Sequence, residues 1–443
     1  GEWTTTSMAF GNKNKLDIIK EIHFPDSIGL LYSAFTYFAG FKVNSGEYKL
    51  MGLAPYGSPK YKKLILEKLI DIKEDGSFRL NMKYFNFATG LTMTNDKFSK
   101  LFGHKVRDPN KDLLTQFHMD IASSVQEVIE IIILKLVKNI QKETKIKNLC
   151  LAGGVALNCV ANGKILKEKI FKNVWVQPAA GDAGGSLGAA LAFWYLELKK
   201  ERKNPNNEDM MKGSYLGTSY SNDKIKDILE SIGARYEKIN DEKMLDQVAK
   251  EISNGKSVGW FQGKMEFGPR ALGARSILAD PRDKETQKNL NLKIKFRESF
   301  RPFAPAVLKE KVREWFDFDG TSPYMLIVAK ILESRKIKVK ENEYEGLEKL
   351  KIKRSTIPAV THVDYSARIQ TVDKLTNPKF YELIRKFNEI TNCPILVNTS
   401  FNVRDEPVVN TVEDAFKCFM STDLDLLAIE NFLLKKEDQI DKI

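Results

Sequence analysis

Residues 148–198 read NLCLAGGVALNCVANGKILKEKIFKNVWVQPAAGDAGGSLGAALAFWYLEL. The first half predicts a short apolar strand, a turn at Gly153–Gly154 and a helix. The second half repeats this order, with a strand, a glycine-rich turn at 181–185 and a second helix. A strand, a glycine turn and a helix, repeated, are typical of α/β folds, whose ligands bind at the carboxyl ends of the strands. We therefore expect the α/β class.

The two glycine turns are candidate phosphate or ribose sites. Backbone N–H groups at Gly153 and Gly154 can approach a ligand closely, and the N-terminus of the following helix favours an anion. Asn158 lies one turn into that helix, where its amide could reach a ligand hydroxyl. A glycine pair alone is routine in such turns, and the second turn strengthens the interpretation. Asp182 in the second turn could hold a metal or simply cap its helix, and the sequence leaves both open.

A second informative stretch, residues 263–306, reads GKMEFGPRALGARSILADPRDKETQKNLNLKIKFRESFRPFAPA. Its cations are interspersed with aromatic residues and a Gly-Pro turn, which indicates a partly buried site. Guanidinium groups in such a place match the oxygens of a phosphate. The alternative is a set of surface cations around a core strand, because charge runs are usually solvated.

Two further segments place polar side chains near predicted strands. We expect strands at 358–364 and 394–398. His362, Asp364 and Arg368 lie on one side of an extended stretch that begins in the first strand, and Ser400 follows the second. A single histidine such as His362 is more often a structural residue than a catalyst. These segments are candidates to complete the anion site.

Composition bounds the organisation of the chain. With 443 residues, 42% hydrophobic and 29% charged, the chain has the size and composition of two or three globular domains. A polar, Asn- and Lys-rich stretch predicts a linker. We therefore expect an N-terminal domain at 1–200, a linker at 201–212 and a C-terminal domain at 213–443.

The net charge and the cysteines do not identify a function, but they indicate which classes of protein fit the sequence. The net charge of +12 could reflect nucleic-acid binding, but the Lys-rich runs are spread from end to end and lack stacking aromatic residues. No apolar run is long enough to cross a membrane, and no export signal opens the chain. Four cysteines without CxxC spacing read as reduced core thiols. We expect a cytoplasmic protein that binds neither membranes nor nucleic acid.

Seven motifs give the sequence a family resemblance. Together, in order, they are similar to the NodU/CmcH family of O-carbamoyltransferases. The motifs are GEYKLMGLAPYG (46–57), AGGVALNCVANGKI (152–165), GDAGGSLGAAL (181–191), EFGPRALGARSILADPR (266–282), FRESFRPFAPAVL (296–308), HVDYSARIQTV (362–372) and NTSFNVRDEPVV (398–409).

The resemblance implies a fold and a reaction. It implies an N-terminal domain with the actin-like ATPase fold, as in tRNA threonylcarbamoyl-transfer enzymes, and a YrdC-like α/β C-terminal domain. The C-terminal site would form carbamoyl-adenylate from carbamoyl phosphate and ATP. The N-terminal site would transfer the carbamoyl group to a hydroxyl of a small acceptor such as a sugar, nucleoside or natural product.

The resemblance also implies roles for individual residues. The positions that match the family's carbamoyl-phosphate site, expected to be catalytic, are Arg270, Lys295, Arg301, Arg368 and Ser400. The nucleotide-contacting positions are Gly153, Gly154, Asn158, Gly181 and Gly184.

The resemblance fails at one point. The family's His-x-x-x-His metal motif precedes a Gly-Glu-Trp stretch, and this sequence begins at Gly1-Glu2-Trp3. Only Asp182 matches the metal set, so we expect an N-terminally truncated domain that exposes apolar surface. Its site for Fe²⁺ or a similar divalent metal would be incomplete, and Mg²⁺ is expected with ATP.

Three questions stay open at the level of sequence. The alternatives are a tRNA threonylcarbamoyl-transfer-like protein, which lacks the GPRALGARS and FRPFAP segments, and a nucleic-acid-binding protein. A homodimer is also left open, as is the identity of the acceptor.

Overall fold

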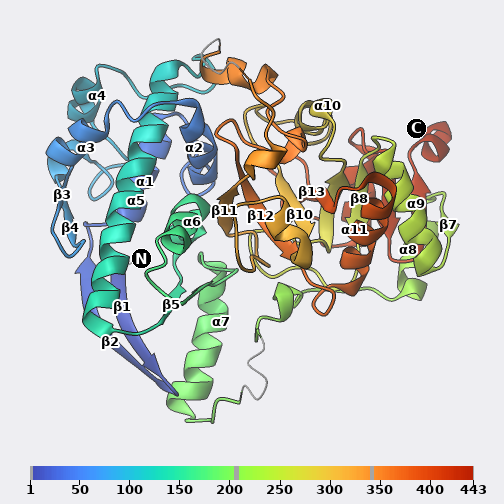
Figure 1. Ribbon diagram of the computed structural model, residues 1–443, viewed down its shortest axis with the longest axis horizontal. Helices are drawn as coiled ribbons and strands as arrows, with labels where there is room; N and C mark the ends of the chain where they lie inside the picture. The colour runs from blue at the N-terminus through green and yellow to red at the C-terminus, as the bar shows by residue number, and fades with distance from the viewer. Residues whose placement is uncertain (1–2, 204–208, 340–343, 443) are drawn as a thin grey trace. The chain divides into compact units, whose positions relative to one another are not determined.

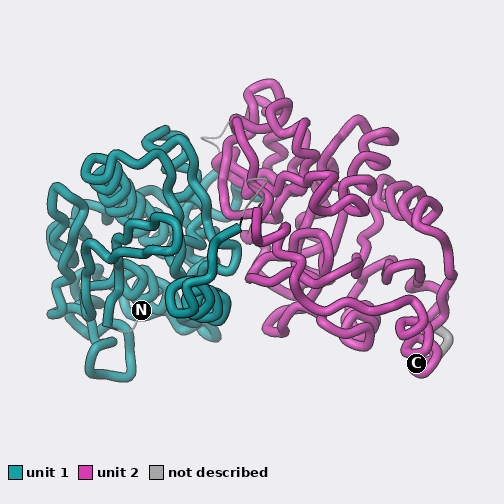
Figure 2. Tube along the Cα trace, turned by 90° about the horizontal axis from the view of Figure 1, so that it is seen from below, with its two compact units in different colours: residues 1–203, 340–351 teal, residues 204–339, 352–443 magenta. Residues whose placement is uncertain are grey.

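The computed structural model describes residues 3–203, 209–339 and 344–442. It divides into two compact units, Gly1–Lys203 with Lys340–Lys351 and Asn204–Val339 with Ile352–Ile443 (Figure 2). The first unit thus includes a short segment from late in the sequence. Of the expected linker, residues 204–208 lie outside the described residues.

The first unit is organised around the long helix α5 (Gln116–Thr144) (Figure 1). Its apolar residues recur at helical spacing, and the stripe from Val125 to Ile132 is buried. Helices α1 (Ile28–Phe38), α2 (Glu47–Leu53) and α3 (Lys62–Lys68) pack against it. Helix α4 (Asp96–Phe102) adds two aromatic rings to the cluster beneath α1.

The strands of the first unit form pairs. They are β1 (Thr4–Asn12) with β2 (Lys15–His23) and β3 (Ile70–Ile72) with β4 (Phe78–Leu80), both antiparallel, and β5 (Asn148–Leu151) with β6 (Asn173–Val176), which is parallel. A 3₁₀ turn and α6 (Cys159–Lys167) follow β5, and α7 (Ala183–Ala192) follows β6. The predicted order of strands and helices in residues 148–198 is confirmed.

The first unit exposes apolar side chains, as expected from the sequence. Helix α7 contains no buried residue, and the π-helical turn Phe193–Glu197 continues it. Exposed fractions along this stretch lie between 43% and 59% for Leu191, Phe193, Trp194, Leu196 and Leu198. Strand β2 is exposed over most of its length.

The second unit is built on one mixed sheet. Among the described residues, nine strands lie in the order β11–β12–β10–β13–β9–β8–β14–β15–β7. Their bounds are β7 Glu237–Lys238, β8 Val258–Phe261, β9 Arg275–Ala279, β10 Ala304–Leu308, β11 Ile327–Lys330, β12 Ser366–Val372, β13 Ile395–Ser400, β14 Leu426–Ile429 and β15 Phe432–Lys435. The mixed α/β class is confirmed.

Helices cover this sheet. They are α8 (Asn222–Ser231), α9 (Asp241–Ser253), α10 (Lys284–Asn289), α11 (Pro378–Thr391) and α12 (Val412–Met420). Helix α11 packs on β10 and β13, and α12 packs on β8 and β14. Every residue of β8, β9, β10 and β14 is buried, so both faces of the central strands are covered.

Two expectations about local structure are wrong. The stretch 358–364 is not a strand, because a 3₁₀ turn occupies Pro358–Val360 and strand β12 begins only at Ser366. Cys150 is exposed on β5, whereas the other three cysteines are buried as expected. No helix within the described ranges is long and apolar enough to span a membrane.

Candidate functional site

The topology of the second unit brings the predicted cationic residues to one end of its sheet. Strands β10 and β12 are parallel and both begin at this end, whereas β13 runs antiparallel to β10 and finishes there with Ser400. Ser400 pairs with Ser276 at the start of β9, so the loop that carries Arg270 enters the sheet at the same end. Arg301 lies just before β10, and Arg368 is near the start of β12.

Lys295 is bound directly to the end of β13. Its Nζ lies 2.8 Å from the carbonyl oxygen of Ser400 and 3.3 Å from the Ser400 hydroxyl, and it also contacts two oxygens of Asn402. The side chain is buried, and burial together with the charges of Arg297 and Arg301 lowers the pKa of Lys295 well below its usual value. The structure therefore brings Lys295 and Ser400 together, and the positive charges of Arg297 and Arg301 lie near enough to lower the pKa of Lys295.

The loop that presents Arg270 is fixed from both sides. Buried Glu266 accepts hydrogen bonds from the backbone N–H groups of Leu272, Ala274 and Arg275, at 2.7, 2.7 and 3.2 Å. Side chains from four other parts of the unit donate to the loop's carbonyl groups. These contacts are Asn398 to Ala271, Gln370 and Tyr215 to Leu272, and Trp260 to Gly273. Arg270 thus sits on backbone whose conformation is set before any ligand binds.

Glycine is required at position 273 of this loop. Its φ is +103°, and an added Cβ would lie 2.2 Å from the ring of Phe380. The loop can pass this ring only without a side chain.

Arg275 has a different role from the one suggested by its place among the cations. Its guanidinium donates to the carbonyl oxygens of Thr218, Gln262, Gly263 and Ala274, and it stacks 3.5 Å from the ring centre of Phe261. Burial lowers its pKa to about 10, although Glu266 and Glu430 oppose this. Arg275 is a structural cation whose two terminal guanidinium nitrogens donate to backbone oxygens, while its buried Nε has no hydrogen-bond partner among the described residues.

Two arginines flank the turn before β10. The side chain of Arg297 donates to Asn291 at 2.6 Å and lies over the ring of Phe303. Arg301 is 3.8 Å from Glu298, and its carbonyl oxygen accepts from Asn291. Both guanidinium groups are therefore oriented by packing and partners.

A tight turn around Asp364 sets the start of β12. Tyr365 adopts a left-handed conformation (φ +62°), and the carboxylate of Asp364 accepts from the backbone and hydroxyl of Ser366 and pairs with Lys330 at 2.8 Å. Burial opposes ionisation of Asp364, but His362, Lys330 and Ser366 outweigh it and lower its pKa to about 2. Nδ1 of His362 accepts from the N–H of Val363, which fits the expected structural histidine.

In the first unit, the two glycine turns lie at one end of the β5–β6 pair, because these parallel strands are in register. Gly153 has a φ of +94°, and a Cβ at Gly153 or Gly154 would meet nothing within 4 Å. At Gly184 a Cβ would lie 2.1 Å from the carbonyl oxygen of Ala179, and at Gly181 it would be 3.7 Å from Leu157. The first turn is therefore open, whereas the second needs glycine at 184 for packing.

Asn158 is part of a polar network within the first unit. Its side chain caps α6 and exchanges two 3.1 Å hydrogen bonds with Gln126 of α5. Gln126 also bonds buried Tyr32 and Glu130. Sequence reasoning missed this network because Gln126 lies 32 positions from Asn158. The nucleotide contact of Asn158 stays a prediction.

The metal assignment has little support around Asp182. Asp182 is exposed at the N-terminus of α7, and its side chain makes no capping hydrogen bond. Within the described residues, no three His, Cys, Asp or Glu side chains are grouped as a metal would require. The residues present do not fit a complete metal centre, and we derive no chemical step from one.

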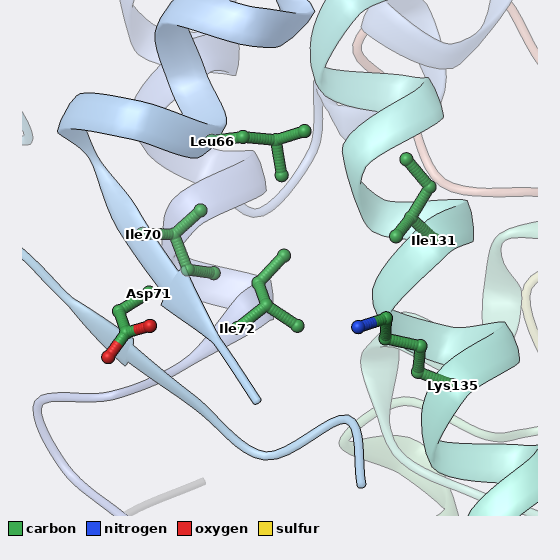
Figure 3. A pocket seen from close by; sticks show the side chains of 6 residues that line it. All are labelled: Leu66, Ile70, Asp71, Ile72, Ile131 and Lys135. Carbon is green, nitrogen blue, oxygen red and sulfur yellow. The ribbon is translucent and has the colours of Figure 1, made fainter. Parts of the chain in front are cut away.

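A shallow hollow elsewhere in the first unit does not coincide with any predicted site residue. It lies between β3 and α5, where Leu66, Ile70, Ile72 and Ile131 point toward one another (Figure 3). Asp71 and Lys135 complete its lining. Lys135 is the one cation of this lining, and its Nζ already donates to the carbonyl oxygen of Lys73, so the hollow does not gather cations as the predicted anion site does.

Comparison with known proteins places the chain in a family. Residues 1–191 match the family model described as carbamoyltransferase N-terminus, and residues 249–436 match carbamoyltransferase C-terminus. Nodulation protein NolO of Bradyrhizobium diazoefficiens is 35% identical over 98% of this chain and 74% of its own length. The chain belongs to the carbamoyltransferase family. It is therefore a transferase enzyme.

Other relatives of this carbamoyltransferase agree. An uncharacterized protein of Synechocystis sp. is 58% identical over 99% of this chain and 72% of its own length. Nodulation protein U of Azorhizobium caulinodans is 29% identical over 72% of this chain and 50% of its own. A crystal structure of full-length HypF in the phosphate- and nucleotide-bound form is 17% identical over 49% of this chain and 22% of that chain. Its TM-score of 0.27 is too low to establish a common fold.

Proposed function

We propose that this carbamoyltransferase makes carbamoyl-adenylate from carbamoyl phosphate and ATP in its C-terminal domain, residues 213–443. It then transfers the carbamoyl group to a hydroxyl of a small acceptor at the N-terminal domain, residues 1–200. The proposal includes the YrdC-like and actin-like folds for these domains. The acceptor class, a sugar, nucleoside or natural product, comes from the family resemblance.

One observation carries the proposal. Arg270, Lys295, Arg301, Arg368 and Ser400, which are far apart in the sequence, are placed at one end of one sheet. Carbamoyl phosphate is a small dianion, and its phosphoryl oxygens suit guanidinium and ammonium donors. Fixed donors stabilise charge that builds on these oxygens during reaction, because they need not reorganise.

The proposed chemistry balances as two steps. Joining the carbamoyl group to AMP breaks the carbamoyl-to-phosphate link and the α–β link of ATP, with uptake of one water, and it releases phosphate and pyrophosphate. In the second step the acceptor oxygen attacks the carbamoyl carbon, AMP leaves, and the hydroxyl proton is lost. The open turn at Gly153–Gly154 is the proposed nucleotide contact of this second site, together with Asn158, Gly181 and Gly184.

Magnesium would enter this scheme with ATP as part of the substrate. Asp182 alone does not make a site for Fe²⁺ or a similar metal, and the proposed chemistry of residues 213–443 does not depend on one.

Arg270→Ala tests the anion site. If Arg270 stabilises charge on the phosphoryl oxygens, its loss should lower carbamoyl-phosphate-dependent pyrophosphate release by about 100- to 1000-fold, or about 2.7–4 kcal/mol. The measurement is pyrophosphate formation from ATP with and without carbamoyl phosphate.

Arg313→Ala is the matched control. This substitution also removes a guanidinium, but the side chain of Arg313 is 70% exposed and pairs with exposed Asp319. It should keep wild-type release. Equal losses in the two variants would mean that net charge, rather than the proposed site, supports the reaction.

The nucleic-acid alternative is less favoured, since the family match accounts for the chain without it. Binding of DNA or RNA that vanishes at modest salt and shows no base preference would indicate charge alone.

A further inference from the structure

The ammonium of Lys295 has no spare hydrogen-bond donor. Lysine carries three N–H donors, and Nζ of Lys295 lies 2.8 Å from the carbonyl oxygen of Ser400, 2.6 Å from that of Asn402 and 2.5 Å from Oδ1 of Asn402. Only 3% of the residue is exposed, so water cannot replace these partners. A buried cation without acceptors is strongly unfavourable.

The side chain of Asn402 serves several groups at once. Its Oδ1 also accepts the hydroxyl of Ser400 at 2.7 Å, and its Nδ2 donates to the carbonyl oxygen of Glu406 at 2.7 Å. One amide oxygen therefore joins Lys295 and Ser400, which the family resemblance assigns to the carbamoyl-phosphate site. The Nδ2 contact fixes the orientation of that amide.

We propose that Asn402 is a positioning residue of the anion site, which holds the Lys295 ammonium and the Ser400 hydroxyl together until a phosphoryl group binds. This inference rests on the proposed function of the cationic end of the sheet. A phosphoryl oxygen is a stronger acceptor for an ammonium than a neutral amide oxygen. An arriving anion can therefore take one N–H of Lys295 without leaving the ammonium unpaired at any stage.

The alternative is that Asn402 only stabilises the turn that follows β13. In that case its important contact would be the Nδ2 bond to Glu406, and its oxygen would be incidental. Asn402→Ala removes both contacts, whereas Asn402→Asp keeps an acceptor oxygen for Lys295 and Ser400 and loses the donor. Because Asp also adds a negative charge that repels anions, the labelling rate of Lys295 is the readout compared between these two variants. The two variants therefore separate the two roles.

The experiment has two readouts on the purified chain. Calorimetry measures the affinity for inorganic phosphate and for carbamoyl phosphate. Mass spectrometry measures how fast a lysine-reactive reagent labels Lys295. Asn240→Ala is the control, because it removes a capping hydrogen bond at the start of α9 and makes no contact with this cluster.

We expect Asn402→Ala to bind both anions about tenfold more weakly and to label Lys295 several-fold faster. Asn402→Asp should label as slowly as wild type, and Asn240→Ala should match wild type in both readouts. Wild-type anion affinity in Asn402→Ala, or equally fast labelling in the Ala and Asp variants, would overturn the inference. If wild type itself binds neither anion, the proposed function of this site fails as well, which is a different result from an unchanged variant.

Discussion

Glu266 should be the most sensitive single position of the loop that presents Arg270. Glu266→Ala would leave three buried N–H donors, those of Leu272, Ala274 and Arg275, without their acceptor. Each unsatisfied buried donor costs about 1–3 kcal/mol, so three of them should lower the free energy of unfolding of the second unit by about 3–9 kcal/mol. Glu266→Gln keeps a carbonyl oxygen and loses the charge. Because charge-assisted hydrogen bonds are about twice as strong as neutral ones, it should lose about 1–2 kcal/mol.

Urea unfolding combined with amide hydrogen exchange measures both effects. Exchange in a peptide covering residues 268–280 reports on the loop itself, even if the two units unfold separately. Glu333→Ala is the control, since its side chain is 87% exposed, and it should change stability by less than about 0.5 kcal/mol. Wild-type exchange in Glu266→Ala, or equal losses in the Gln and Ala variants, would refute the reasoning.

Two further predictions concern the first unit. Gly184→Ala should lower the melting temperature of this unit, because the new Cβ would lie 2.1 Å from the carbonyl oxygen of Ala179. Gly185→Ala is the control, since its Cβ would meet nothing within 4 Å, and it should be neutral or slightly stabilising. Equal melting temperatures for the two variants would contradict this prediction. The second prediction is a pH dependence: burial lowers the pKa of His118 to about 4, so the unfolded state binds the proton first. The free energy of unfolding should then fall by about 2 kcal/mol as the pH drops from about 6.5 to 4. His118→Gln keeps the capping box of α5 and should remove this loss; an unchanged pH profile would show that His118 is not its source.

The sequence predicts the elements whose residues carry a regular apolar period. Apolar residues recur at helical spacing from Ser123 to Thr144 and predict a helix there, and the structure extends α5 to Gln116. Its first turns contain the polar residues His118 and Asp120, which break the apolar stripe, and the capping pair Thr115 and His118 defines the start. The stretch 358–364 shows the opposite error, since an apolar run with a proline formed a 3₁₀ turn.

The candidate site was predicted only in part. The composition around Arg270 and Lys295 indicated buried cations that need oxygen acceptors, but it could not say which acceptors are the protein's own. The terminal guanidinium nitrogens of Arg275 donate to backbone carbonyl oxygens, and Lys295 bonds to Ser400, 105 positions away.

The roles of Glu266 and Asn402 were missed for different reasons: the partners of Glu266 lie 6 to 9 positions along the chain and meet it only through the shape of the loop, whereas Asn402 meets Lys295 across 107 positions. Those partners are backbone groups of the loop and the ammonium of Lys295. The one local signal for Glu266 is an acidic residue beside the Gly-Pro turn, in a segment otherwise rich in cations.

The most direct test of the central claim is pyrophosphate release from ATP by the wild-type chain, measured with and without carbamoyl phosphate. We predict that release requires carbamoyl phosphate and that one phosphate appears for each pyrophosphate. Pyrophosphate release at the same rate without carbamoyl phosphate, or none under either condition, would contradict the proposed role of the cationic end of the sheet.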